Sequence, residues 1–430
     1  MEFLESIWEP MLLPILKVSV VVFVIGMGIG TLLTLVERKQ SAYMQRRIGP
    51  NRANLRIGGL NLRLNGLVHL AADGIKMLLK EDFVPAGANK RLHLLAPMIG
   101  LIPAMIIFAI VPFMDFWCDG TNIVVDGMDY CLPEGAAANG SWQLAELANP
   151  TYNPLLKHYF QIADMNAGLL YMFAITGISV YGTALAGWAS NSKFSLLGGL
   201  RASAQMISYE VSMGLSLAGI LMIYGSIDVN DMVREQGQLL FGFLPMWGIV
   251  VQPLAFIMFL TASIAESKRA PFDMPEAESE LVAGYFTEYS SMKFAVFSLG
   301  EFVAIGFIAA ITATLFLGGW HIPWLYADGF HFTDAGMMAE SVSVTGQGVA
   351  DYIAGAKDHG PDIALPYWMV VLLRIGGFLG KIVFLCFLQL QLRWTLPRFR
   401  YDQIMHLGWK ILLPLSLLNL LVTAVIMAFI

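Results

Sequence analysis

The segment 263–293 carries the densest group of ionisable side chains in the chain, and it lies between two strongly apolar stretches. Its cations are Lys268, Arg269 and Lys293. Its carboxylates are Glu266, Asp273, Glu276, Glu278, Glu280 and Glu288. Charge at a membrane boundary is costly to hold and usually marks a path for protons, ions or a polar headgroup. We therefore expect this loop to handle charge rather than only to connect two spans.

The spacing of three of these glutamates indicates shared protons. Glu276 and Glu280 are four residues apart, with Glu278 on another face if the segment is helical. Like charges at this spacing destabilise a helix when both are ionised, so their titrations should be coupled. The alternative is an ordinary solvated run of charge. Prolines and apolar residues interleaved at 271–275 favour a shaped, partly buried loop.

Two further carboxylates, Glu210 and Glu301, fall inside apolar stretches. Each lies about seven residues from the end of its span nearest the charged loops, which is roughly 10 Å deep at the helical rise per residue. We therefore expect the two side chains to be able to approach each other. Ionisable groups within a membrane are usually functional, which favours proton handling over the alternative of a structural ion pair.

The elements that must position these groups are transmembrane helices. The chain of 430 residues is 57% hydrophobic and 13% charged, with a mean hydropathy of +0.64. Stretches of about 20 apolar residues are long enough to cross a bilayer. The sequence therefore predicts an all-α polytopic membrane protein with a single membrane domain over 1–430. Its eight predicted spans cover about 12–35, 94–114, 167–188, 204–224, 244–264, 294–318, 367–391 and 411–430.

The basic residues predict the orientation of these spans. The loops on one side are 36–93, 189–203, 265–293 and 392–410, and together they hold 20 of the 26 lysines and arginines. The opposite loops carry only Lys157, Arg234 and Lys357. Because cytoplasmic loops are enriched in Lys and Arg, we expect the first set to be cytoplasmic and both termini to be periplasmic. The protein should be multi-pass in a bacterial inner membrane, with the mitochondrial inner membrane as the alternative.

The first cytoplasmic loop also contains helical periodicity. Apolar residues recur every three or four positions, and polar residues of both charge signs fall on the opposite face. The apolar stripe consists of Leu60, Leu64, Leu67, Ala71, Ile75 and Leu78, and the polar face of His69, Asp73, Lys76 and Lys80. Such a helix is expected to lie along the membrane surface. It is either a simple anchor, or the wall of a cavity or a docking surface.

The chain has few residues that could hold a cofactor. Its three cysteines form no CxxC pair and its histidines fall in loops or at the edges of spans, so we expect no iron–sulfur cluster and no haem. We find no nucleotide-binding loop for a flavin and no cluster of metal ligands. Cys118 and Cys131 share the first long outer loop and could form a disulfide in an oxidising compartment.

Six cytoplasmic motifs resemble those of the H-subunit of NADH:quinone oxidoreductase, respiratory complex I. They are ERKQSAYMQRRIGPN at 37–51, ADGIK at 72–76, GWASNSK at 187–193, RASAQMISYE at 201–210, AESKRAPFDMPEAESEL at 265–281 and PRFRYDQIMHLGWK at 397–410. They cover every cytoplasmic loop in the order of that family. The outer loops 115–166 and 319–366 look longer than the family usually has, and their role stays open.

The resemblance implies roles for the charged residues. The cytoplasmic loops would form a chamber that ubiquinone enters from the bilayer, and electrons would come from a cluster in a neighbouring iron–sulfur subunit. The residues implied to line or gate this chamber are Glu37, Arg38, Arg46, Asp73, Lys76, Arg201, Glu266, Arg269, Asp273 and Arg393. Those implied to form a proton path toward small membrane-arm subunits and antiporter-like subunits are Glu210, Glu276, Glu278, Glu280, Glu288 and Glu301.

Two other functions remain open from the sequence. One is the homologous membrane subunit of an energy-converting hydrogenase, which would have a different soluble partner. The other is a stand-alone cation/proton antiporter that uses Glu210, Glu301 and Lys381. The antiporter hypothesis leaves the elaborate cytoplasmic loops unexplained. Neither alternative involves nucleic acid, because the basic residues are spread along one membrane face.

Overall fold

The computed structural model describes most of the chain. The described residues are 13–57, 60–62, 64–114, 116–118, 121–125, 128–132, 157–163, 165–240, 244–273, 282–326, 329–330 and 363–429. The protein is mostly helical within these ranges. Glu276, Glu278 and Glu280 lie outside the described residues.

Seven helices within the described ranges are long and apolar enough to cross a membrane. The first combines α2 (Leu13–Ser19), the π-helical η2 (Val20–Gly26) and α3 (Met27–Met44), and the second combines α5 (Lys90–Ile106) with η3 (Ile107–Ile110). The next four are α8 (Gly168–Ala189), α9 (Lys193–Tyr224), α14 (Ser291–Phe316) and α16 (Tyr367–Thr395). The last is built from α17 (Tyr401–His406), η5 (Leu407–Leu412) and α18 (Leu413–Phe429).

The fifth of the eight predicted spans, 244–264, is interrupted in the structure. A short helix α11 (Gly248–Val251) is followed by α12 (Pro253–Glu266), and Gln252 between them leaves the helical conformation at φ −136° and ψ 68°. The cause is local: Pro253 has no N–H to donate, and its ring disfavours a helical residue before it. The buried amide of Gln252 donates to Thr423 Oγ1 at 2.6 Å and accepts from Asn419 Nδ2 at 3.2 Å, which ties the break to α18.

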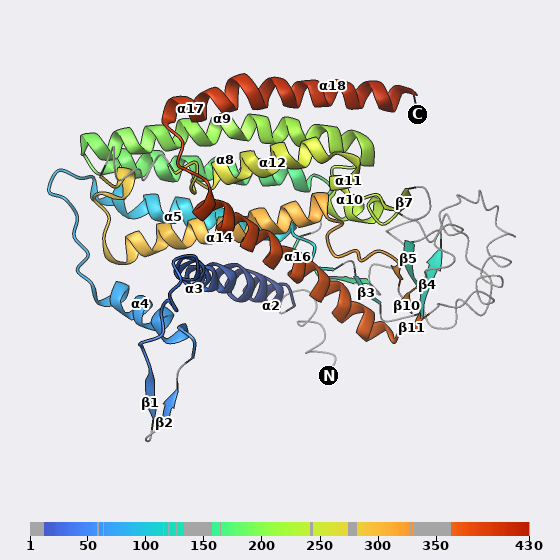
Figure 1. The fold of residues 1–430 in the computed structure, drawn as a ribbon, viewed down its shortest axis with the longest axis horizontal. Coiled ribbons are helices and arrows are strands. Elements are labelled where there is room, and N and C mark those ends of the chain that lie inside the picture. Colours follow the sequence, from blue (N-terminus) through green and yellow to red (C-terminus); the bar gives the residue numbers. More distant parts are fainter. Residues whose placement is uncertain are drawn as a thin grey trace, which may run out of the picture.

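Smaller elements gather at the two ends of the helical bundle (Figure 1). At one end lie α4 (Leu67–Leu79) and the antiparallel hairpin of β1 (Leu55–Ile57) and β2 (Leu60–Leu62), which pairs Leu55 with Leu62. The opposite end carries short antiparallel strands and α10 (Val229–Glu235). These strands are β3 (Phe116–Cys118) with β6 (Lys157–Tyr159), β4 (Thr121–Val125) with β5 (Met128–Leu132), β7 (Leu239–Leu240) with β8 (Leu244–Pro245), and β10 (Gly329–Phe330) between β9 (Leu325–Tyr326) and β11 (Ile363–Ala364).

The predicted amphipathic helix is present but shorter than its apolar stripe. It begins at Leu67, whereas Leu60 belongs to strand β2 and Leu64 lies in the connection. Gly66 ends that connection with φ +101°, a conformation that glycine adopts without strain. A Cβ at this position would also lie 2.8 Å from the carbonyl oxygen of Pro50. The helix α4 buries none of its own side chains.

Two groups of buried side chains hold the bundle together. The larger runs along α9, α12, α14 and α16. The smaller consists of Ala96, Ala186, Ala202, Tyr285, Phe286, Tyr289 and Phe297. It packs the 3₁₀ turn η4 (Gly284–Phe286) among α5, α8, α9 and α14, near the end that carries α4. The turn can approach α9 closely because a Cβ at Gly198 would lie only 2.6 Å from Gly284 Cα.

We expect Gly182→Ala to destabilise the bundle, because the added Cβ would lie 2.8 Å from the backbone nitrogen of Gly100 on α5. Forcing an extra methyl group into a packed interface typically costs about 1–3 kcal/mol. The thermal midpoint of the purified protein measures the effect. The matched control is Gly376→Ala on α16, where an added Cβ meets nothing within 4 Å. Equal midpoints for the two variants would contradict this account of the α5–α8 contact.

Candidate functional site

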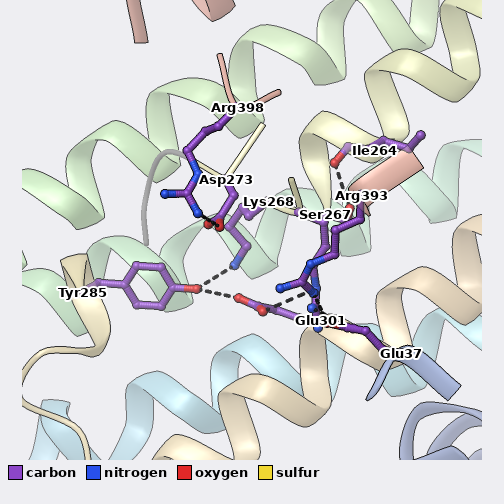
Figure 2. Close-up of polar contacts among 10 residues, drawn as sticks. Glu37, Ile264, Ser267, Lys268, Asp273, Tyr285, Glu301, Arg393 and Arg398 are labelled. Atoms are coloured by element: carbon purple, nitrogen blue, oxygen red, sulfur yellow. Dashed lines mark hydrogen bonds and ion pairs between the residues drawn. The ribbon is translucent and has the colours of Figure 1, made fainter. Parts of the chain in front are cut away.

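An arginine between two buried glutamates is the centre of the candidate site. Arg269, in the loop after α12, places Nη1 3.4 Å from Glu37 Oε2 on α3 and Nε 3.7 Å from Glu301 Oε2 on α14. Its guanidinium also covers the ring of Phe302 at 4.0 Å from the centroid. The second oxygen of Glu37 lies 2.6 Å from Arg393 Nη1, at the end of α16. Helices far apart in sequence therefore meet through one row of charges (Figure 2).

These charges are largely removed from solvent. The side chains of Arg269, Glu37 and Glu301 are 11%, 12% and 8% exposed. A buried charge is tolerated only when it is paired, and removal of one partner leaves the other uncompensated. The row balances two arginines against two glutamates, so a change of charge at one end alters the electrostatic balance along its length.

A tyrosine extends the row beyond Glu301. Tyr285 in η4 donates its hydroxyl hydrogen to Glu301 Oε1 at 3.0 Å and accepts from Lys268 Nζ at 3.3 Å, as Figure 2 shows. The ring of Tyr285 is fully buried in the smaller hydrophobic cluster, which fixes the direction of its hydroxyl. A hydroxyl that both donates and accepts can pass a proton between its two neighbours.

Asp273 forms a second ion pair beside this row. Its Oδ2 lies 3.1 Å from Arg398 Nη2 (Figure 2), and Oδ1 has no hydrogen-bond partner among the described residues. Burial raises the pKa of the Asp273 carboxyl to about 6, and Glu301 adds to the rise, while Arg398, Arg393 and Arg269 oppose it. Asp273 therefore holds a proton more readily than an exposed aspartate does.

A buried amide holds the loop that carries Arg269 and Asp273. Gln205 on α9 is fully buried, and its Nε2 donates to the carbonyl oxygens of Ala265 at 2.7 Å and Phe272 at 2.8 Å. Ser267, which directly follows α12, donates its hydroxyl hydrogen to the carbonyl oxygen of Ile264 in the last turn of that helix, at 2.8 Å. The loop therefore has a defined conformation, which gives its charged side chains fixed positions.

An open cleft of about 490 Å³ adjoins the row at Glu37. It lies between the end of α3, the following loop, α4 and the end of α16, and its lining includes Arg38, Arg47, Arg52, His69 and Trp394. Arg38, which lines the cleft, is ion-paired with Asp73 of α4. The cleft thus combines several hydrogen-bond donors with one large aromatic wall.

A second, internal cavity of about 80 Å³ begins at Glu301. Glu266, Ser267 and Lys268 line the end near the charged row, and Thr176 lines it on the α8 side. The hydroxyl of Thr176 lies 3.4 Å from Glu210 Oε1. One water needs about 10–15 Å³ of such space. The cavity therefore has room for several waters between Glu301 and the neighbourhood of Glu210.

Other sequence-predicted residues lie in different surroundings. Arg201 stacks on the ring of Tyr401 at 5.5 Å, and the backbone carbonyl of Glu288 accepts from His93 Nε2 at 3.3 Å. Arg46 and Lys76 are exposed and line neither cavity. Glu210 and Glu301 do not contact each other directly: Glu301 lines the internal cavity, and Glu210 lies behind Thr176 on its wall. The side chains of Cys118 and Cys131 lie outside the described part of the structure, so their pairing stays a prediction.

Lys381 does not pair with the intramembrane glutamates. Its ammonium donates to the carbonyl oxygens of Leu317 at 2.7 Å, Gly319 at 2.9 Å and His321 at 2.8 Å, just beyond the end of α14. It also lies 4.7 Å from the centroid of the Trp247 ring. This lysine therefore links the residues just after the C-terminal end of α14 to α16.

Sequence reasoning did not single out Tyr285, Lys268, Arg398 or the cleft residues His69 and Trp394 as site residues. Lys268 and Arg398 fall within two of the six motifs, which is a signal that could have found them. Tyr285 depends on how η4 packs, which no local pattern predicts. Among the described residues, no group of three or more His, Cys, Asp or Glu side chains could hold a metal ion.

Asp273→Asn is expected to change the pH dependence of stability. A carboxyl whose pKa is raised by folding contributes most below its unfolded pKa of 3.8, and that contribution is lost as the pH rises through about 6. Asn resembles the protonated acid, so the variant should be more stable than the parent at pH 8, and this advantage should shrink toward pH 5. Thermal midpoints across this range measure it. A constant difference between the two proteins would exclude the proposed titration.

Comparison with known proteins agrees with the six motifs. The profile of the NADH dehydrogenase family matches residues 16–424. The NADH-quinone oxidoreductase H-subunit 2 of Koribacter versatilis is 40% identical over 424 residues, which are 97% of this chain and 98% of that protein. The H-subunit 2 of Geobacter metallireducens is 39% identical over 414 residues, with 96% and 95% covered.

A third relative, the H-subunit 1 of Cytophaga hutchinsonii, is 36% identical over 402 residues, which are 94% of this chain and 93% of that protein. These three relatives align with the chain over nearly their whole lengths. The chain belongs to the H-subunit family of NADH-quinone oxidoreductases, which are membrane subunits of complex I that bear no iron–sulfur cluster.

Proposed function

We propose that this chain forms the quinone-access chamber of complex I and couples quinone reduction to proton translocation. The observation that carries the proposal is the buried row Glu37–Arg269–Glu301. One end of the row lines the open cleft, and the other lines the internal cavity. A change of charge in the cleft therefore has a short route to an internal cavity lined by Glu301 and Glu266.

The cleft suits a quinone headgroup. Its volume of about 490 Å³ falls within the usual 300–1,000 Å³ of small-molecule sites. Arg38 and His69 can donate hydrogen bonds to quinone oxygens, and Trp394 offers an aromatic face. Ubiquinone is the substrate in this proposal. Its electrons come from the terminal iron–sulfur cluster of a neighbouring subunit, and Asp73, Arg393 and Asp273 complete the charged surroundings of the chamber.

Reduction of a quinone in a low-dielectric chamber creates negative charge, which competes with Glu37 for the nearby arginines. When Arg269 shifts toward the chamber, Glu301 loses part of its positive partner. Tyr285 and the internal cavity then connect Glu301 with Lys268, Glu266 and Glu210. Glu276, Glu278, Glu280 and Glu288 would carry protons on toward small membrane-arm subunits and antiporter-like subunits.

In this proposal the end of the bundle with α4 is cytoplasmic and both termini are periplasmic. The excess of basic residues in loops 36–93, 189–203, 265–293 and 392–410 supports this orientation. The helix α4 would lie at the membrane surface beside the quinone entrance. The interrupted helix pair α11–α12 would cross the membrane as the fifth span in chain order, which brings the total to eight. The bonding of Lys381 to carbonyl groups disfavours the antiporter alternative, which needs a lysine that exchanges protons.

We expect Glu210→Gln and Glu301→Gln to assemble while lowering both quinone reduction and the number of protons moved per quinone. The amide keeps the shape of the side chain but cannot exchange a proton. The measurement is NADH:quinone activity and proton uptake in liposomes that contain the whole complex. Glu235→Gln on α10, at the opposite end of the bundle, is the control. Full activity and full pumping in both variants would reject the proton-coupling role.

Arg38→Ala should raise the KM for ubiquinone more than it lowers kcat, because it removes a donor that binds the headgroup before and after reduction. Loss of one charge-assisted hydrogen bond corresponds to about a tenfold change. Arg400→Ala removes an exposed arginine that pairs with Asp402, and it serves as the control. An unchanged KM in Arg38→Ala would place the headgroup elsewhere.

A further inference from the structure

The last turn of α4 is attached to the end of the acidic loop by a hydroxyl group. Ser291 Oγ lies 2.8 Å from the carbonyl oxygen of Met77 and 3.0 Å from that of Lys80. The final carbonyls of a helix have no partner within the helix, and the single hydroxyl hydrogen of Ser291 can be donated to either of these two carbonyls. Ser291 adopts φ +55°, which is unfavourable for a residue with a side chain and directs the hydroxyl toward α4.

Two further contacts join the same segments. Lys293 Nζ lies 3.1 Å from Asp82 Oδ1, and the lysine side chain is only 10% exposed. Ser290 Oγ donates to the carbonyl oxygen of Glu81 at 3.3 Å. We call residues 80–82 and 93 together with 288–293 the α4 joint.

A buried histidine completes the α4 joint. His93 at the start of α5 is 0% exposed, and its ring stacks on Tyr289 with centroids 4.1 Å apart and planes 4° from parallel. Its Nε2 lies 3.3 Å from the carbonyl oxygen of Glu288. A carbonyl can only accept, so Nε2 carries the hydrogen. Nδ1 is buried and has no hydrogen-bond partner among the described residues, which favours the neutral ring.

The other face of α4 belongs to the cleft. His69 lines the cleft, and Asp73 pairs with Arg38, which also lines it. Since α4 buries none of its own side chains, these contacts and the α4 joint largely determine its position. Elements with few buried contacts shift more readily than packed helices. The α4 joint is also where α14 begins, and α14 carries Glu301.

We propose that His93, Ser291 and Lys293 are positioning residues that make the α4 joint rigid, so that displacement of α4 at the cleft moves Glu288 and the start of α14 with it. This inference rests on the proposed function and adds a mechanical connection to the electrostatic one through Arg269. The ion pair and the serine hydrogen bonds join the end of α4 and the residues after it to the end of the acidic loop, and the ring stack joins the same end of the loop to α5.

Lys293→Met and His93→Phe test the α4 joint in liposomes that contain the whole complex. Phe keeps a ring for Tyr289 but lacks the N–H donor. Each variant should lower the number of protons moved per quinone reduced by about twofold or more. Lys90→Met, an exposed lysine at the start of α5 and outside the α4 joint, is the matched control and should leave the ratio unchanged. A role in folding alone would reduce the amount of complex without changing this ratio, which would overturn the inference.

Rescue variants distinguish the specific contacts from general damage. The exchanged pair Lys293→Glu with Asp82→Lys restores the ion pair, and His93→Gln restores an N–H donor, so both should recover most of the ratio. A normal ratio in both Lys293→Met and His93→Phe would overturn the inference. If the joint variants pump normally while Glu210→Gln and Glu301→Gln do not, the rigid joint is wrong and the proposed function stands.

A measurement on the complex without substitutions tests the inference even if the variants fail to assemble. Amide hydrogen exchange is compared with and without a short-chain ubiquinone. The inference requires that exchange in 67–79 and in 288–293 change together. A change in exchange confined to 67–79 would show that α4 moves independently of 288–293, and this result would overturn the inference.

Discussion

The structure depends on a single guanidinium shared between two buried carboxylates. Arg269 holds Glu37 on α3 and Glu301 on α14, and removing it would leave buried negative charge without its shared partner. The pairing constrains the helices: α3 and α14 must bring their glutamates to the same depth, and the loop after α12 must present the arginine between them. Gln205 meets the last requirement by fixing both ends of the short loop segment 265–272.

The site is rigid on one side and open on the other. Buried aromatic rings hold Tyr285, while the residues of the cleft wall on α4 are half-buried or exposed. For the proposed function, this division would let a quinone enter the open cleft while the distances within the row of charges stay fixed. A displacement of about 1 Å within the row would weaken both ion pairs of Arg269, because charge interactions in a low-dielectric interior change steeply with distance.

Hydropathy was sufficient to predict the seven long spans, because about 20 consecutive apolar residues are long enough to cross a bilayer whatever the neighbouring helices are. It failed where local backbone chemistry intervenes. Pro253 interrupts the fifth predicted span at Gln252, and Gly66 starts α4 later than the apolar stripe suggests. The structure brings Glu37, Arg269, Arg393 and Glu301 of the predicted site together. The sequence could not show which carboxylates Arg269 would join, because that depends on the conformation of a loop that buried amide contacts hold.

The three carbonyl groups around Lys381 have a consequence for the direction of proton movement. Lys381 donates its N–H groups to three backbone carbonyl oxygens just beyond the end of α14, an arrangement of dipoles like those that coordinate cations in proteins. For the proposed function, a proton leaving Glu301 along α14 toward the outer surface would meet a lysine nitrogen whose hydrogens already point at three carbonyl oxygens. The arrangement favours an exit parallel to the membrane, toward a neighbouring subunit, over a vertical exit through this chain.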